Sequence, residues 1–202
     1  MKRRLWLIAV CLLIVGTVPL ARPDAAADPA AVIVNLGNEA LKVLGKDVDP
    51  NQRITRFRQL FVQDFDVPGI ARFVLGRYWH LATPAQRQDF VAVFTNYIAL
   101  AYSNRLAEYS GETLRVTGSR PAPDGSLVTS EIMRPHGEPP AKVDWLLTRQ
   151  HGAYKINDVV VEGVSMAVTQ RSEFASVIQR NGGQLQGLIT ALRQKTEGAG
   201  LR

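Results

Sequence analysis

The sequence contains little of what metal-binding or disulfide-bonded proteins rely on. It has one cysteine and three histidines in 202 residues, and Cys11 lies in an apolar stretch near the N-terminus. The chain beyond that stretch therefore has no cysteine with which to form a disulfide. His80, His136 and His151 lie far apart, and none has a second ligand three or four residues away. We expect ordinary surface or turn histidines and no bound metal.

The short motifs of catalysis and nucleotide binding are also missing. Ser165 lacks the second glycine of a nucleophile elbow. The pair Gly182-Gly183 is followed by no lysine and preceded by no strand, so it does not predict a phosphate-binding loop. Two carboxylate pairs lie at expected helix boundaries, Asp47 with Asp49 and Asp64 with Asp66. Helix capping explains both pairs without any acid–base chemistry.

Long runs of like charge are absent as well. The whole chain has a net charge of +6, but four of its 24 basic residues and one of its 18 acidic residues fall within residues 1–27, which leaves +3 on the remainder. With no basic run and no interleaving of basic and aromatic residues, this charge does not indicate nucleic-acid binding. At 46% hydrophobic and 21% charged residues, the composition is that of a globular domain.

One long apolar run is present, at the N-terminus. The basic start Lys2–Arg4 precedes 16 uncharged residues, 5–20, and Ala25–Ala27 follows. A basic start, an apolar centre and small residues at the cleavage position are typical of a secretory signal peptide. The run is short for a membrane span of about 20 residues, although an uncleaved anchor is the alternative. We expect cleavage of residues 1–27 and export to a periplasm, with residues 28–202 forming a single domain.

Helix-start signals recur in the first half of the exported chain. Asp28-Pro29, Asp49-Pro50 and Thr83-Pro84 each place a capping side chain before a proline at the first helical position. Gln52 and Gln86 stand where a capping box needs Glu or Gln. Apolar residues at helical spacing predict helices that include residues 54–61, 67–75, 90–102, 164–178 and 185–192.

Between these helices the sequence is rich in β-branched residues. The predicted strands cover residues 114–116, 127–133, 143–148 and 154–161. Asp124-Gly125 is a strong hairpin signal between the first two strands. Short turns between consecutive strands predict an antiparallel meander. The order of helices, sheet and helices predicts an α+β fold, with helices on one face of a curved, four-stranded antiparallel sheet.

The predicted strands have more apolar residues than a sheet with one buried face needs. Val143, Trp145 and Leu147 share one face of the third strand, with Leu146 on the other, and residues 159–161 are all valine. A sheet covered on both faces explains this excess. A concave sheet whose helices stand off from it, enclosing an apolar cavity, explains it as well.

Three motifs follow one another in a characteristic order. The first is Leu75-Gly76-x-Tyr78 with Ala82–Arg87 and an aromatic helix, and the second is Arg134-Pro135 before a strand that contains tryptophan. The clearest is Val161–Met166, which is followed by Glu173-Phe174, Ile178, Gly183 and Leu188. In this order the motifs cover nearly all of the exported chain, which resembles the MlaC family of periplasmic phospholipid carriers, also known as toluene-tolerance proteins. The chain is also similar to the hopanoid-associated HpnM proteins, so that branch stays open.

The resemblance implies a carrier that is not an enzyme and needs no cofactor. A cavity between the helices and a twisted sheet would hold the acyl chains of a phospholipid, while the headgroup stays in water. The implied partners are an inner-membrane ABC transporter with an MCE-domain protein and an outer-membrane lipoprotein–porin complex. Such a carrier would help to maintain the lipid asymmetry of the outer membrane. Nothing in the sequence indicates an obligate dimer, so we expect a monomer.

Periodicity and the matched motifs together predict which residues line the cavity. The helical candidates are Leu75, Tyr78, Phe94, Ile98 and Tyr102. The sheet candidates are Val128, Ile132, Val143, Trp145 and Val161, with Val164 and Met166 closing one end. Plain core packing is the alternative for each of them. Arg72 and Arg77 are candidates for contact with a headgroup or a partner.

Two other classes of protein stay open at this point. An isomerase-like enzyme with a cone-shaped α+β cavity would use Asp144 or Asp158 as general base, beside Tyr97 or Tyr154. Strand alternation places Asp144 opposite Val143, which argues against that residue. A periplasmic scaffold with a filled core is the other alternative, and bound lipid would distinguish it from a carrier.

Overall fold

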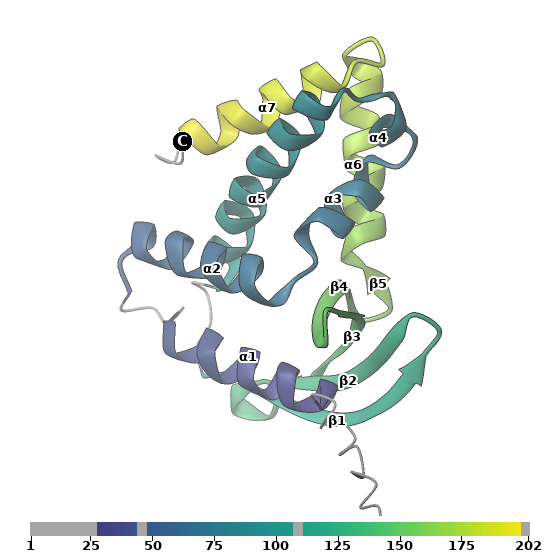
Figure 1. The fold of residues 1–202 in the computed structure, drawn as a ribbon. Coiled ribbons are helices and arrows are strands. Elements are labelled where there is room, and N and C mark those ends of the chain that lie inside the picture. Colours follow the sequence, from purple (N-terminus) through teal and green to yellow (C-terminus); the bar gives the residue numbers. More distant parts are fainter. Residues whose placement is uncertain (1–27, 44–47, 107–110, 199–202) are drawn as a thin grey trace, which may run out of the picture.

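The computed structural model describes residues 28–43, 48–106 and 111–198, and its helices come before and after a sheet (Figure 1). The predicted signal peptide lies outside these residues. The first helices are α1 (Pro29–Val43), α2 (Pro50–Asp64), α3 (Val67–Leu75), α4 (Arg77–Leu81) and α5 (Pro84–Leu106). The strands are β1 (Thr113–Ala122), β2 (Gly125–Met133), β3 (Ala141–Gln150), β4 (Ala153–Val161) and β5 (Val164–Ser165), and the last helices are α6 (Met166–Arg180) and α7 (Leu185–Glu197). The predicted α+β class is confirmed.

The predicted capping residues begin their helices. The Oδ1 atom of Asp49 accepts hydrogen bonds from the backbone N–H groups of Asn51 at 3.0 Å and Gln52 at 3.1 Å. Thr83 and Gln86 form a reciprocal capping box, in which each backbone N–H donates to the other side chain, at 3.1 and 3.2 Å. These bonds satisfy amides that the first turn of a helix leaves without partners.

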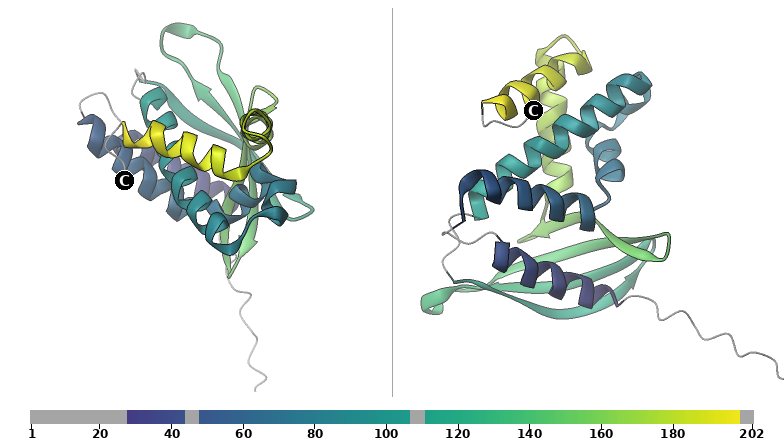
Figure 2. Two further views of the ribbon diagram at one scale, coloured as in Figure 1. Left: turned by 90° about the horizontal axis from the view of Figure 1, so that it is seen from above. Right: turned by 60° about the vertical axis from the view of Figure 1, so that its left-hand side comes forward.

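The sheet is an antiparallel meander with the strand order β1-β2-β3-β4-β5. Its register shifts twice, between Val116 and Gly118 in β1 and between Leu146 and Leu147 in β3. Bulges of this kind bend a strand and increase its twist. The sheet accordingly curves beneath the helices, as the second view of Figure 2 shows.

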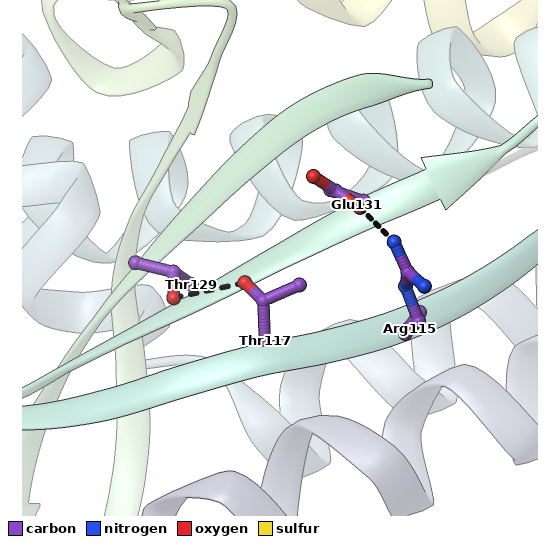
Figure 3. Close-up of polar contacts among 4 residues, drawn as sticks. All are labelled: Arg115, Thr117, Thr129 and Glu131. Carbon is purple, nitrogen blue, oxygen red and sulfur yellow. Dashed lines mark hydrogen bonds and ion pairs between the residues drawn. The ribbon is translucent and has the colours of Figure 1, made fainter. Parts of the chain in front are cut away.

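The outer face of β1 and β2 is polar. Arg115 and Glu131 are register partners, and their side chains form an ion pair of 2.5 Å. Next to them the hydroxyl of Thr117 donates to that of Thr129 at 3.1 Å, so the four side chains make two cross-strand pairs (Figure 3). Helices therefore need to cover only the other, concave face of these strands.

The concave face is covered near β1 and β2 by α1. Ile33 of α1 is fully buried, in a cluster with Val128, Leu147 and Ile156, which come from β2, β3 and β4. We call these four residues the sheet core. Helix α1 also contacts α2, so it connects this part of the sheet to the remaining helices.

A second and larger core lies among α2, α3, α5, α6 and α7. Its centre is aromatic, because Phe90 stacks on Phe94 at a centroid distance of 5.6 Å and Phe174 meets both rings edge-on, at 5.8 and 6.0 Å. Aromatic pairs in this geometry contribute about 0.5–1.5 kcal/mol beyond the area that they bury. We call this cluster the helical core; it also includes Leu75 and Tyr78.

The structure departs from the sequence-based elements at the end of the sheet. The helix expected from residue 164 begins at Met166, because Val164 and Ser165 instead pair with β4 as the short strand β5. The connecting turn places Glu162 and Gly163 at φ values of +50° and +80°. A fifth strand is thus added to the four predicted ones, and Ser165 becomes the N-cap of α6, accepting from the N–H of Val168 at 3.0 Å.

Candidate functional site

An apolar cavity of about 460 Å³ lies between the helical layer and the concave face of the sheet. This volume is within the range of about 300–1,000 Å³ that is usual for ligand pockets. Helices α2, α3, α5 and α6 and strands β2, β3 and β4 contribute to the wall, together with Phe65, which directly follows α2. The lining residues are Phe57, Phe61, Phe65, Ile70, Val74, Phe94, Ile98, Tyr102, Arg105, Ile132, Val143, Trp145, Asn157, Asp158, Val159, Val161, Met166, Ala167 and Gln170.

Helix α2 gives the cavity an aromatic wall that the sequence analysis missed. Phe57, Phe61 and Phe65 follow one another at intervals of four residues, so they lie along one face at the end of this helix. The ring centroids of Phe57 and Phe61 are 6.4 Å apart, and those of Phe61 and Phe65 are 5.0 Å apart. Phe65 packs against both the helical core and the sheet core. The regular spacing of these aromatics was the signal that could have identified them.

On the sheet side, Trp145 presents an indole ring whose polar atom is already satisfied. Its Nε1–H donates to the hydroxyl of Ser130 at 2.9 Å, and that hydroxyl donates to the carbonyl of Val143 at 3.0 Å. A tryptophan whose N–H has a partner can face an apolar space without an unsatisfied donor. The remaining surface of the ring is thus available to an apolar ligand.

Asp158 is the carboxylate in the cavity wall, and it holds the start of α6. Its two oxygens accept hydrogen bonds from the Ser165 hydroxyl at 2.5 Å and from the N–H groups of Ala167 at 3.0 Å and Val159 at 2.8 Å. A carboxylate near a helix N-terminus is favoured by the helix dipole. These three donors assign Asp158 a structural role in joining β4 to α6.

Asn157, another polar residue of the cavity wall, has a side-chain oxygen that no described residue hydrogen-bonds. Its Oδ1 atom is buried and has no hydrogen-bond partner in the part of the chain that the structure describes. Buried polar atoms normally have a partner. A side-chain amide can present either its oxygen or its NH2 group after rotation, so Asn157 can accept from or donate to a polar atom in the cavity.

Arg105 lies at the edge of the cavity, in the last turn of α5. Its side chain is exposed, and its guanidinium carbon lies 5.4 Å from the ring centroid of Tyr102. Burial, the largest cause, raises the pKa of the Tyr102 phenol, and nearby Arg105 opposes this shift. The phenol therefore keeps its proton at neutral pH, and both Tyr102 and Arg105 line the cavity.

The structure brings eight of the twelve predicted cavity residues together. Those that line the cavity are Phe94, Ile98, Tyr102, Ile132, Val143, Trp145, Val161 and Met166. Leu75 and Tyr78 are instead buried in the helical core, and Val128 lies in the sheet core. Val164, on the edge strand β5, is 53% exposed. Alternation in strands and helices separates inside from outside, but it does not separate a cavity wall from the filled core beside it.

The two predicted arginines lie elsewhere. Arg72 and Arg77 line a second, open pocket on α3 and α4, which shares no lining residue with the apolar cavity. Contact between these arginines and a headgroup or a partner stays a prediction. In the described part of the chain, the cation that lines the apolar cavity is Arg105, which the sequence analysis did not select.

The geometry gives little support to the isomerase-like alternative. Asp144 does not line the cavity, and in the register it lies between Thr129 and Val160, on the outer side of the sheet. Asp158 does line it, but its oxygens already accept three hydrogen bonds. A general base needs an oxygen that can take up a substrate proton.

Two features are absent from the described residues. No group of three or more His, Cys, Asp and Glu side chains in residues 28–43, 48–106 and 111–198 is placed to hold a metal ion. Over the same residues, no helix is long and apolar enough to cross a membrane.

Two proteins of known character are similar to this chain in sequence. The chain is 29% identical over 144 residues to the toluene tolerance protein ttg2D of Pseudomonas putida, a match that covers 70% of this chain and 66% of that protein, slightly under two thirds of its length. It is 24% identical over 150 residues to the intermembrane phospholipid transport system binding protein MlaC of Haemophilus influenzae, covering 72% of this chain and 69% of the relative.

A solved structure shares the fold. It is a phospholipid-binding protein from Ralstonia solanacearum in complex with a phospholipid, with a TM-score of 0.70 and 24% identity, over 85% of this chain and 98% of that one. The family model described as MlaC protein matches residues 35–194, which include every described helix and strand from most of α1 to most of α7. The chain therefore belongs to the MlaC family, as the order of its motifs indicated.

Proposed function

We propose that this protein is a periplasmic carrier that holds the acyl chains of a phospholipid in the apolar cavity. It would move lipid between an outer-membrane lipoprotein–porin complex and an inner-membrane ABC transporter with an MCE-domain protein. The observation that carries the proposal is the cavity of about 460 Å³, with aromatic and aliphatic walls and a cation at its edge. The phospholipid named for the Ralstonia structure and the transport role named for the Haemophilus relative support it.

The energetics of lipid transfer suit such a cavity. Two acyl chains contain roughly 30 CH2 groups, and burying each one from water is favourable by about 0.8 kcal/mol, which amounts to on the order of 20 kcal/mol. Lipid therefore does not cross water alone. A bilayer and an apolar cavity are similar surroundings for acyl chains, so the net free energy of transfer between them is small. A carrier can then both load and unload, and the partners determine the direction.

Two polar residues would orient the lipid in this cavity. Arg105 is exposed at the edge, where its guanidinium can meet the phosphate while the headgroup remains in water. Asn157 lies in the wall with an unpartnered amide oxygen, and its rotated NH2 group can donate to an ester carbonyl. The chains would then lie along the aromatic wall formed by Phe57, Phe61 and Phe65.

The first test is native mass spectrometry of residues 28–202, purified without detergent and followed by lipid extraction. We expect a mass excess that corresponds to a diacyl phospholipid. A hopanoid or another apolar ligand in the extract would support a carrier function, but with a ligand other than phospholipid. A protein that is free of lipid, and remains so after incubation with liposomes, would contradict the proposed carrier.

A matched pair of variants locates the lipid. Val161→Trp places an indole in the cavity wall and should reduce the bound lipid by at least about tenfold, since the added ring occupies ligand volume. Val160→Trp is the control, because the neighbouring residue of the same strand is half-buried and does not line the cavity. Equal lipid occupancy in both variants would show that the acyl chains lie elsewhere.

A further inference from the structure

Another pocket between the described residues is basic, and it lies on a different side of α3 from the apolar cavity. It has a volume of about 510 Å³ and is lined by Arg72 and Phe73 of α3, Arg77 of α4 and Arg171 of α6, among others. Ile70 and Val74 of the same helix α3 line the apolar cavity. One helix therefore forms part of the wall of both pockets.

The three guanidinium groups of this pocket form no ion pair with another described residue. In the described residues, no carboxylate lies within 4.0 Å of the side-chain nitrogens of Arg72, Arg77 or Arg171, whereas Arg115, Arg134 and Arg193 all form ion pairs. Asp66, at the start of α3, caps that helix by accepting from the N–H of Gly69 at 3.1 Å. Converging cations without carboxylates favour an anionic ligand.

The fold holds two of these cations in place. Arg171 lies 5.3 Å from the ring centroid of Phe73, and its guanidinium would be only 2.9 Å from a Cβ atom at position 76. Gly76, with a φ of +52°, thus permits this close approach. Arg77 lies 4.9 Å from the ring centroid of Tyr78 and donates to its hydroxyl at 3.0 Å. Pre-positioned guanidinium groups lose less entropy when they bind an anion.

Large apolar side chains are exposed beside these arginines. Phe73 is 43% exposed, Leu81 at the end of α4 is 77% exposed, and Val168 of α6 is 55% exposed. Leu81 follows Arg77 by four residues and Val168 precedes Arg171 by three, so these two apolar residues each share a helix face with an arginine. We call Arg72, Phe73, Arg77, Leu81, Val168 and Arg171 the arginine patch.

We propose that the arginine patch docks the protein on the surface of a membrane that contains anionic phospholipid. The guanidinium groups bind lipid phosphates, and Phe73, Leu81 and Val168 enter the boundary between headgroups and acyl chains. Basic residues together with exposed apolar ones are the combination that such surfaces bind. The net charge of +3 on residues 28–202 keeps the attraction weak, so docking stays reversible. The proposal adds a membrane contact to the proposed carrier, and it does not require that the cavity holds phospholipid.

The test is vesicle flotation with phosphatidylcholine vesicles, with and without phosphatidylglycerol. The double variant Arg72→Gln/Arg171→Gln should bind the anionic vesicles about thirtyfold more weakly, since each arginine near an anionic surface contributes about fivefold. The matched control is Arg120→Gln/Arg149→Gln, which removes the same charge from exposed positions of the sheet. It should change binding by less than about twofold.

Other outcomes of this test are also decisive. Equal binding of the native protein to vesicles with and without phosphatidylglycerol would overturn the proposal, as would equal losses in the two double variants. A patch variant that loses affinity for inorganic phosphate but keeps its vesicle binding would assign the pocket to a free phosphate instead. Native mass spectrometry of the same variant tests lipid binding in the cavity separately from membrane docking. If the variant retains lipid, the proposed carrier function holds, whatever the flotation experiment shows about docking.

Discussion

The helical core and the sheet core differ in size and completeness. Among the described residues, the helical core contains 18 buried side chains, whereas the sheet core contains four. The residues of the helical core come from several helices, which pack around them and bury them. The concave face of β3 and β4, by contrast, is only partly buried at Trp145, Val159 and Val161, and these residues line the cavity.

The difference explains how the fold can keep a cavity open between its two layers. The helices pack mainly on one another, so their burial does not depend on close contact with the sheet. Two connections hold the layers apart at a fixed position. Asp66 donates its backbone N–H to the carbonyl of Ile156 at 2.8 Å, and Asp158 binds the start of α6. Phe65, beside the first connection, is shared by the two cores.

The largest expected effect comes from breaking the helical core. Phe90→Ala removes a fully buried ring that packs on Phe94 and Phe174, and it should lower the free energy of unfolding by about 3–5 kcal/mol. Urea denaturation measures the change. The matching variant on the sheet is Val161→Ala, in the cavity wall. It should lower the free energy of unfolding by less than about 1.5 kcal/mol, because the Val161 side chain already faces a cavity. Equal costs would show that the sheet wall is packed as fully as the helices.

A smaller effect is expected from the connection between sheet and α6. Asp158→Asn keeps the size of the side chain but removes the charge that accepts from Ser165 and Ala167, and it should cost about 1–2 kcal/mol. Asp144→Asn is the control, since that side chain lies on the outer face and should change stability by less than about 0.5 kcal/mol. Loss of lipid binding without loss of stability in Asp158→Asn would indicate a direct contact with ligand instead.

Most of the fold could be predicted from the sequence because its signals are local. Caps such as Asp49 and the Thr83–Gln86 box fix helix starts within one turn of chain, and Asp124-Gly125 joins β1 to β2. Strand β5 was missed because it is two residues long and depends on pairing with β4 across the turn at Gly163. The pairing partner, and not local preference, determines such a strand.

The cavity was only partly predictable, for a different physical reason. Phe94 and Tyr78 are both buried aromatics at helical spacing, yet Phe94 lines the cavity and Tyr78 does not. The distinction depends on how far α2 and α5 stand from β3, which is a property of the whole packed molecule. Arg105 was missed because an exposed arginine at a helix end has no signal that places it at a cavity edge. Arg171 was missed because its neighbours Phe73 and Gly76 lie about a hundred residues earlier in the chain.

The smallest predicted effect concerns Asp64, the last residue of α2, near the join between the two layers. Burial, and next the charge of Glu39, raise the pKa of this carboxyl above its usual value of 3.8, while Lys155 opposes them. The folded state therefore binds the proton more tightly than the unfolded state. Its contribution to stability is fully present below about pH 3.8 and is lost as the pH rises through the folded-state pKa.

Asp64→Asn removes the ionised carboxylate that is unfavourable at pH 7. Because the group is only half-buried, solvent screens it, and we expect a gain of less than about 1 kcal/mol at pH 7 that shrinks toward about pH 4. Urea denaturation at several pH values measures it, with Asp124→Asn in the exposed hairpin turn as the control that should show no such trend. A loss of stability at pH 7 would mean that attraction to Lys155 outweighs burial. The carboxylate would then be a third connection, because Lys155 of β4 also donates to the carbonyl of Gln63 in α2.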